Sequence, residues 1–233
     1  MSNLLFTELA TLADLHAVAA ERVLVGGREA LDARGRFHLV LAGGNTPRAL
    51  YEGLAKRAGD LDWTRVHLWW GDERCVPRDH ADSNFKMAWD AWLSAFGLPE
   101  ERVHRMRGEL GLPAAVEDYA SQIRSEFGAQ GPVFDFVLLG LGTDGHTASL
   151  FPAVAAAGGA WVVGISGAPK PPRERISLSE RALGAARRRL FLVAGGDKAA
   201  PLEEIRRRGS GVASRIAWAG ASEICFFRGS ESA

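Results

Sequence analysis

Asp144, Gly145 and His146 place a carboxylate and an imidazole on either side of a flexible backbone position, shortly after an apolar run over residues 134–139. A short apolar run of this kind is typical of a buried strand. A carboxylate beside an imidazole fixes its tautomer and keeps the ring basic enough to take a proton from water near neutral pH. We therefore predict that His146 is a general base and Asp144 its partner. The alternative is a structural histidine tied to a loop carbonyl.

The same stretch also has the glycine spacing of a dinucleotide-binding loop, at Gly140, Gly142 and Gly145. Such a loop opens a full helix and is followed about 20 residues later by an acid that holds a ribose. Here Pro152 interrupts the chain early, and residues 160–166 contain no acid. We therefore expect no dinucleotide cofactor.

A second loop follows the apolar stretch 37–44 and contains Gly43, Gly44, Asn45 and Thr46. The two glycines allow a ligand to approach the backbone, and a helix that begins at Pro47 offers free N–H groups to an anion. The short side chains of Asn45 and Thr46 can cap this helix or hold a phosphate oxygen. The loop lacks the Gly-Lys-Ser/Thr ending of a P-loop. An ordinary capped turn remains the alternative to phosphate binding.

Charged side chains in three further loops suit an anionic substrate. Arg74 offers a planar fork for an anion, and Asp72 can orient a substrate hydroxyl or a catalytic group. A proline-rich loop presents Lys170 and Arg175, and Lys198 begins a helix after a glycine pair. Each of these charges alone is explained by exposure to solvent, Asp72 and Arg74 also by an internal ion pair. Together the basic residues indicate a cationic wall around the site.

The elements that carry these loops alternate along the chain. Strands are expected at 37–44, 66–74, 134–139, 160–166, 175–179, 188–196 and 222–227, and helices at 11–34, 47–58, 83–96, 113–127 and 198–208. This alternation predicts a Rossmann-like α/β fold, a three-layer α/β/α arrangement with a mostly parallel sheet. Loops at the carboxyl ends of parallel strands meet at one edge. With no linker or repeat, we expect one domain over residues 1–233.

Composition excludes several classes of function. The 233 residues contain 28 Lys+Arg and 28 Asp+Glu, so nothing draws the chain toward nucleic acid or a membrane surface. No window approaches 18 consecutive apolar residues, and the N-terminus lacks the basic start of a signal peptide. Two cysteines are too few for a disulfide framework or a thiolate metal site. We expect a cytoplasmic protein without a metal.

Five ordered blocks of the sequence resemble the 6-phosphogluconolactonase family: LAGGNTPRALYEGLA, WWGDERCVP with DSNFKMAWDAWL, FDFVLLGLGTDGHTASLFP, APKPPRERISLS and LVAGGDKA. The wider group includes glucosamine-6-phosphate deaminases and ribose-5-phosphate isomerases and shares a Rossmann-like three-layer sheet. The resemblance implies an ester hydrolase that converts 6-phospho-D-glucono-1,5-lactone to 6-phospho-D-gluconate, the second step of the oxidative pentose phosphate pathway. It implies no metal or organic cofactor, and a small sugar-phosphate lactone as the partner.

The resemblance also assigns roles to individual residues. His146 matches the general base and Asp144 its partner, while Gly43, Gly44, Asn45 and Thr46 match the loop that holds phosphate or the substrate chain. Arg74, Arg175 and Lys198 match basic substrate-binding positions.

Two departures from the family pattern stand out. Asn45 replaces the serine that is more common in the first loop, and the sequence after residue 208 matches the usual ending poorly. Two other functions stay open: isomerisation or deamination of a sugar phosphate with Asp72 and His146 as acid and base, and a non-catalytic sugar-phosphate sensor. The chain is expected to be a monomer or a homodimer.

Overall fold

The computed structural model describes residues 3–96, 98–152 and 159–229. Its main sheet contains seven strands in the order β1-β10-β9-β6-β2-β3-β5, and every neighbouring pair is parallel. The strands are β1 (Leu4–Glu8), β2 (Phe37–Leu41), β3 (Val66–Trp70), β5 (Val103–His104), β6 (Phe136–Leu139), β9 (Arg188–Ala194) and β10 (Ser222–Phe227).

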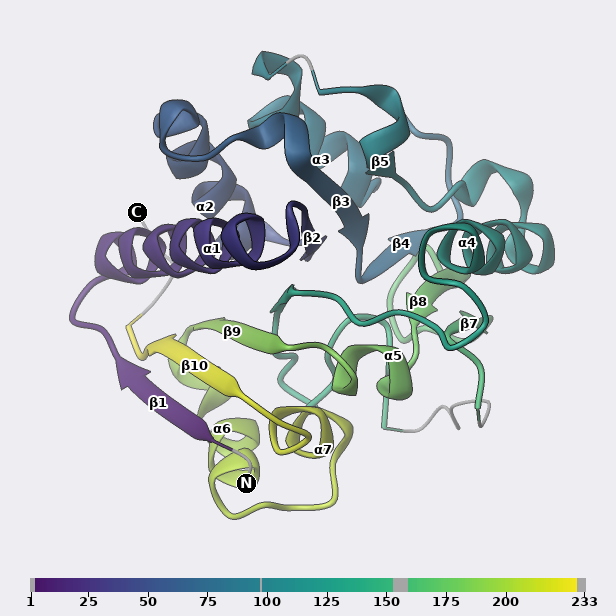
Figure 1. Cartoon of the computed structure of the whole chain (residues 1–233). Helices are drawn as coiled ribbons and strands as arrows, with labels where there is room; N and C mark the ends of the chain where they lie inside the picture. The colour runs from purple at the N-terminus through teal and green to yellow at the C-terminus, as the bar shows by residue number, and fades with distance from the viewer. Residues whose placement is uncertain (1–2, 97, 153–158, 230–233) are drawn as a thin grey trace.

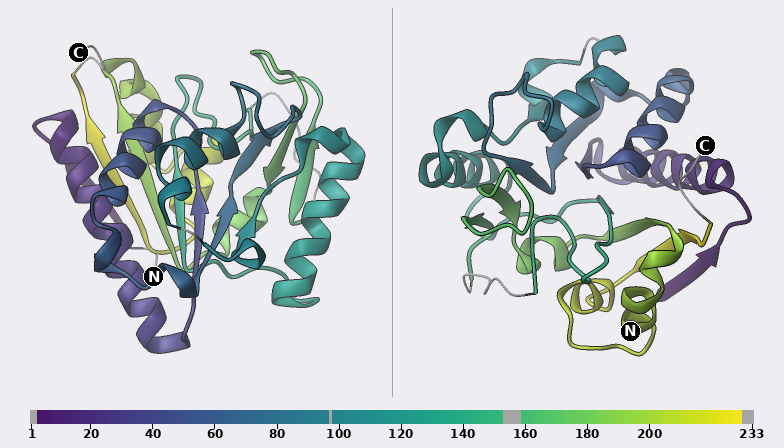
Figure 2. Two further views of the ribbon diagram at one scale, coloured as in Figure 1. Left: turned by 90° about the horizontal axis from the view of Figure 1, so that it is seen from above. Right: turned by 180° about the vertical axis from the view of Figure 1, so that it is seen from behind.

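Helices cover both faces of this sheet, as its apolar strands require. All residues of β2 and β6 are buried, which is the pattern of a parallel sheet packed on both sides. Figure 1 shows α1 and α2 on one face and α6 and α7 on the other, with the strands between them, and Figure 2 (left) looks from above onto the sheet, whose strands run side by side. The helices are α1 (Leu12–Arg34), α2 (Asn45–Ala55), α3 (Asn84–Ala91), α4 (Leu112–Phe127), α5 (Glu180–Gly184), α6 (Ala199–Arg206) and α7 (Val212–Ala217). The three-layer, mostly parallel fold is confirmed.

Two of the expected strands do not join the main sheet. Instead β7 (Val162–Ile165) and β8 (Arg175–Leu178) form a small antiparallel sheet with β4 (Asp72–Arg74), which directly follows β3. Only nine residues separate β7 from β8, too few for the helical crossover that a parallel pair needs. The strands expected at 160–166 and 175–179 are therefore present, but in a small antiparallel sheet beside the parallel one.

The chain ends contribute two strands at one edge of the main sheet. The β1 strand, which the apolar pattern did not predict, pairs with β10, and β10 pairs with β9. The C-terminal part that matches the family pattern poorly thus supplies α7 and an internal strand. Among the described helices, none is long and apolar enough to cross a membrane.

The strand order reverses between β2 and β6. From β2 the chain crosses to β3 on one side, and from β6 it proceeds through the small sheet to β9 on the other side. The loops after these two strands must diverge, and ligands of open α/β sheets bind in the crevice that this divergence leaves.

Candidate active site

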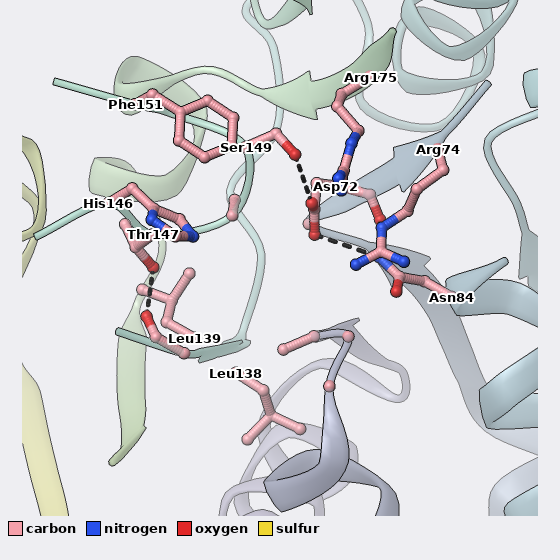
Figure 3. A pocket seen from close by; sticks show the side chains of 16 residues that line it. Asp72, Arg74, Asn84, Leu138, Leu139, His146, Thr147, Ser149, Phe151 and Arg175 are labelled. Carbon is pink, nitrogen blue, oxygen red and sulfur yellow. Dashed lines mark hydrogen bonds between the residues drawn. The ribbon is translucent and has the colours of Figure 1, made fainter. Parts of the chain in front are cut away.

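A pocket of about 130 Å³ lies in this crevice, beyond the carboxyl ends of β2, β3 and β6. Figure 3 shows His146, Thr147, Ser149 and Phe151 on one side of it and Asp72, Arg74, Asn84 and Arg175 on the other. The backbone of the loop after β2 completes the lining through Ala42, Gly43 and Gly44. The convergence of the three loops, expected from the sequence, is therefore present.

His146 and Asp144 form a hydrogen-bonded pair beside the pocket. The ring Nδ1 of His146 lies 2.5 Å from Oδ1 of Asp144, which also accepts the backbone N–H of His146 at 3.1 Å. Because an ionised carboxylate only accepts, Nδ1 carries the proton and a neutral ring has its lone pair on Nε2. This Nε2 makes no hydrogen bond to any described residue. The arrangement is that of a base whose accepting atom is available to a ligand.

Hydrogen bonds with His146 also favour the ionised form of Asp144. Partial burial works against ionisation of Asp144, but the bonds from the ring and backbone N–H of His146, together with the charge of that ring, lower the pKa of the Asp144 carboxyl. Asp144 is therefore an anion at neutral pH, as a group that orients an imidazole must be.

The local backbone places the imidazole. A Cβ at Gly142 would lie 2.0 Å from Nδ1 of His146, so only glycine permits the ring to fold back over this loop. The hydroxyl of Thr147 donates to the carbonyl of Gly140 at 2.7 Å and closes the turn. The ring of Phe151 packs against the imidazole with 4.7 Å between centroids. Contacts on several sides thus restrict how the imidazole can turn.

Two arginines meet at the opposite wall. The antiparallel register of β4 and β8 sets Arg74 directly opposite Arg175. Arg175 is only 7% exposed, and its Nε and Nη2 donate to the carbonyls of Pro172 and Lys170 at 2.6 and 3.2 Å. Burial, and next the positive charge of Arg74, lower the pKa of Arg175. Like charges opposed across a sheet are unfavourable, so this pair favours a bound anion.

Asn84 connects the first two loops. It begins α3, and its Nδ2 donates to the backbone carbonyl of Asp72 at 2.9 Å. A Cβ on Gly43 would lie 2.1 Å from Oδ1 of Asn84, so glycine at this position lets the first loop reach the asparagine. Asn84 was not among the site residues predicted from the sequence, which placed it only at the start of the helix expected at 83–96. The sequence offered one indication of this role: Asn84 stands at the start of a helix, shortly after Asp72 and Arg74.

Glu73 holds the start of α3 in place through hydrogen bonds. This 2%-exposed carboxylate accepts the backbone N–H groups of Arg74, Asn84 and Phe85 and the hydroxyl of Ser83, at 2.7 to 3.0 Å. Burial raises the pKa of Glu73, and these four hydrogen bonds oppose the rise. A negative charge is favourable at a helix N-terminus, so Glu73 fixes Asn84 without entering the pocket.

A second, more open cavity of about 360 Å³ adjoins the first. The two share Gly44, Arg74 and Asn84, and the second is also lined by Asn45 and Arg48. The N-terminus of α2 lies here without a side-chain cap. A ligand longer than the first pocket can therefore extend past Gly44 toward uncapped backbone N–H groups and a cation.

Three of the predicted binding residues do not line either cavity. Lys170 is exposed, and its carbonyl, not its ammonium group, contacts Arg175. Lys198 pairs with Asp197 at 3.1 Å, outside both linings. Thr46 lies in the first turn of α2 and does not line them either. Gly43, Gly44, Asp72, Arg74, His146 and Arg175 line the first pocket, and Asn45 the second.

One cluster away from the pocket has the spacing of metal ligands. Ligand atoms of His38, His67 and Glu126 lie within 4.8 Å of one another, brought together by two strands and α4. The indole N–H of Trp69 donates to Nδ1 of His38 at 3.2 Å, and Arg102 lies 3.1 Å from Nε2 of His67. Since Trp and Arg only donate, the ring nitrogens that face Glu126 carry the protons. Nδ1 of His67 lies 3.0 Å from Nε2 of His104, whereas Nε2 of His38 lies 3.6 Å from Glu126 and has no hydrogen-bond partner. A metal at this cluster would have to displace both protons.

Several known proteins resemble this chain over most of its length. A family model described as glucosamine-6-phosphate isomerases/6-phosphogluconolactonase matches residues 10–222. The 6-phosphogluconolactonase of Synechocystis sp. is 41% identical over 184 residues, which cover 76% of this chain and 74% of that protein. The human 6-phosphogluconolactonase is 40% identical over 202 residues, 84% and 76% of the two chains.

Solved structures extend the likeness to the whole fold. The crystal structure of 6-phosphogluconolactonase from Thermotoga maritima superposes with a TM-score of 0.86 at 28% identity, over 97% of this chain and 100% of that one. Together with the matched residues 10–222, these similarities show that the chain belongs to the glucosamine-6-phosphate isomerase/6-phosphogluconolactonase family, as its five motifs predict.

Proposed function

We propose that this protein hydrolyses 6-phospho-D-glucono-1,5-lactone to 6-phospho-D-gluconate, with His146 as general base and without a metal. One observation carries the proposal: His146, whose Nε2 is available to a ligand, lines the same small pocket as Arg74 and Arg175, which lie opposite each other on β4 and β8. The relatives named 6-phosphogluconolactonase support the choice of a sugar-phosphate lactone as substrate.

In the proposed complex the lactone ring occupies the pocket and its phosphate extends past Gly44. The loop of Gly43, Gly44, Asn45 and Thr46 holds the phosphate together with the open N-terminus of α2. Asn45 keeps an N–H donor where the family more often has a hydroxyl, so it serves the same purpose with a longer reach.

The charged side chains complete the proposed complex. Arg74 and Arg175 bind the anionic and developing negative groups, and Asp72 accepts a substrate hydroxyl. Lys170 and Lys198 are assigned as outer contacts, which reach the substrate after their side chains turn toward it.

The reaction needs only proton transfer and electrostatic stabilisation. Nε2 of His146 takes a proton from water as the water oxygen attacks the lactone carbonyl carbon. The carbonyl oxygen becomes an oxyanion, stabilised by an arginine or by backbone N–H near Gly142. When the intermediate collapses, the bond from this carbon to the ring oxygen breaks, and the leaving oxygen receives the proton from Nε2. The new carboxylic acid then loses a proton to solvent.

Proton release provides the direct test. Freshly generated lactone is added to the protein in weak buffer, with and without EDTA, and the rate is compared with spontaneous hydrolysis. We expect a rate well above background that the chelator leaves unchanged. A rate abolished by EDTA and restored by metal would refute the metal-free mechanism. Turnover of glucosamine 6-phosphate or ribose 5-phosphate with no turnover of lactone would replace the proposal by an isomerase or deaminase.

A further inference from the structure

The only two tyrosines of the chain make the same unusual contact. Tyr51 of α2 and Tyr119 of α4 are both 0% exposed. The hydroxyl of Tyr51 accepts the backbone N–H of Ala42 at 2.9 Å and donates to the carbonyl of the same residue at 2.8 Å. The hydroxyl of Tyr119 does the same with Trp70, at 2.9 and 3.0 Å. Each tyrosine thus satisfies both backbone polar groups of one residue.

Both contacted residues lie where a strand loses a neighbour. The pairing of β2 with β6 ends at Val40, so the next residue whose polar groups face β6, Ala42, has no strand partner. The pairing of β3 with β5 ends at Trp69, which leaves Trp70 without a strand partner on that side. Buried N–H and C=O groups must be paired, and a hydroxyl can both donate and accept. The tyrosines therefore take the place of the missing strands.

The loops of the pocket begin directly after these two residues. Ala42 precedes Gly43 and Gly44, and Trp70 precedes Gly71 and Asp72, all of which line the pocket. Beside β2 the crevice exists because β6 diverges, and beside β3 the short strand β5 ends. Both arrangements remove the hydrogen bonds that would hold the strand ends. A hydroxyl delivered from a helix restores those bonds without closing the crevice.

We propose that Tyr51 and Tyr119 are positioning residues that fix the first two substrate-binding loops by pairing the last peptide groups of β2 and β3. Burial raises the pKa of both phenols, so each stays protonated and keeps the donor that the carbonyl requires. The kinetic consequences rest on the proposed lactonase function, whereas the loop geometry does not.

The test uses Tyr51→Phe and Tyr119→Phe, which keep the ring and remove the hydroxyl. Trp63→Phe is the matched control, because it also removes a hydrogen bond from a buried aromatic side chain to a backbone carbonyl, partly buried and 3.0 Å long. Trp63 lies before the first residue of β3, at the end of the strand away from the pocket.

For Tyr51→Phe we expect KM for the lactone to rise about 10-fold with kcat within about threefold, because the displaced loop is the proposed phosphate loop. Tyr119→Phe should lower kcat/KM by a similar factor. A merely structural role would instead reduce the amount of folded enzyme and leave KM unchanged, as expected for Trp63→Phe. An unchanged KM in Tyr51→Phe and an unchanged kcat/KM per folded molecule in Tyr119→Phe would overturn the proposal.

Backbone amide exchange, followed by NMR, gives a readout independent of activity. In the unmodified protein the amides of Ala42 and Trp70 should exchange about as slowly as those of Leu39 and Leu68 within the strands. Each variant should accelerate exchange at its own loop and leave the strand interiors protected. Rapid exchange at both residues in the unmodified protein would refute the inference even if a variant failed to fold. If the unmodified protein lacked lactonase activity, the proposed function would fail while exchange still decided the tyrosine roles.

Discussion

The hydroxyl of Ser149 donates to Oδ2 of Asp72 across 2.6 Å, although the two residues are 77 positions apart in the chain. Both are buried, Ser149 at 0% exposure and Asp72 at 8%. The other carboxylate oxygen of Asp72 lies 3.4 Å from Nδ2 of Asn84. Asp72 therefore joins the loop that carries His146 to the loop that carries Arg74, and the separation of the two walls depends on it.

Replacing Ser149 by Ala should destabilise the protein. The change leaves a buried carboxylate oxygen without its donor, which costs about 1–3 kcal/mol of unfolding free energy. Urea denaturation measures the loss, with Ser166→Ala as control because Ser166 is exposed. Equal midpoints for the two variants would show that the Ser149–Asp72 bond contributes nothing net.

Replacing His146 by Ala should remove most of the lactonase rate above background. Loss of a general base costs about 10²- to 10⁴-fold, while contacts to the phosphate remain. Proton release gives kcat, and calorimetric titration with 6-phosphogluconate gives the retained affinity. Unchanged activity in this variant would remove His146 from the mechanism.

Replacing Asp144 by Asn tests the tautomer separately from the base. An amide at this position no longer requires the proton on Nδ1, so a fraction of the rings would present a protonated Nε2 to water. We expect kcat to fall by about 10²-fold or more with KM nearly unchanged. A variant with normal kcat would mean that the contact of 2.5 Å between Asp144 and His146 is structural only.

The sequence predicts that Arg175→Ala and Lys198→Ala both weaken substrate binding. The structure indicates which of the two effects is larger. Arg175 lines the pocket, whereas Lys198 pairs with Asp197 outside it. We expect KM to rise about 10- to 100-fold for Arg175→Ala and less than about threefold for Lys198→Ala. A larger effect at Lys198 than at Arg175 would reverse this ranking and make Lys198 a principal substrate contact.

The protein should become less stable as the pH is lowered, because of His38. Burial, and next the charge of His67, lower the pKa of His38 from 6.5 to about 3. Between these values the unfolded chain binds a proton that the folded protein does not, so stability present above about pH 6.5 is lost progressively as the pH falls toward 3. This histidine alone contributes about 1.4 kcal/mol per pH unit within the window.

Urea denaturation at pH 7, 6 and 5 measures this slope, and His38→Asn is the comparison because its amide oxygen can still accept the N–H of Trp69. Its slope should be smaller by about 1.4 kcal/mol per pH unit. Equal slopes in the two proteins would mean that His38 becomes protonated within the folded state.

The sequence by itself determined the features that depend on near neighbours in the chain. Apolar runs identified β2, β3 and β6, because strands buried on both faces have few polar positions. Asp144 and His146 are two residues apart, and Gly145 between them has the left-handed φ of 80° that brings both groups to one turn. The dyad is therefore a local property that residue types can reveal.

Only the tertiary structure decided which distant residues share the pocket. Arg175 faces Arg74 because β8 folds back antiparallel onto β4, and Ser149 and Asn84 reach Asp72 because packing brings three loops together. The same packing leaves Lys198 beside Asp197 and outside the pocket, although its place at a loop resembles that of Arg175. The sequence shows which residues are charged and which lie in loops. Whether such a residue faces the pocket depends on strand pairing, which involves residues from the whole chain.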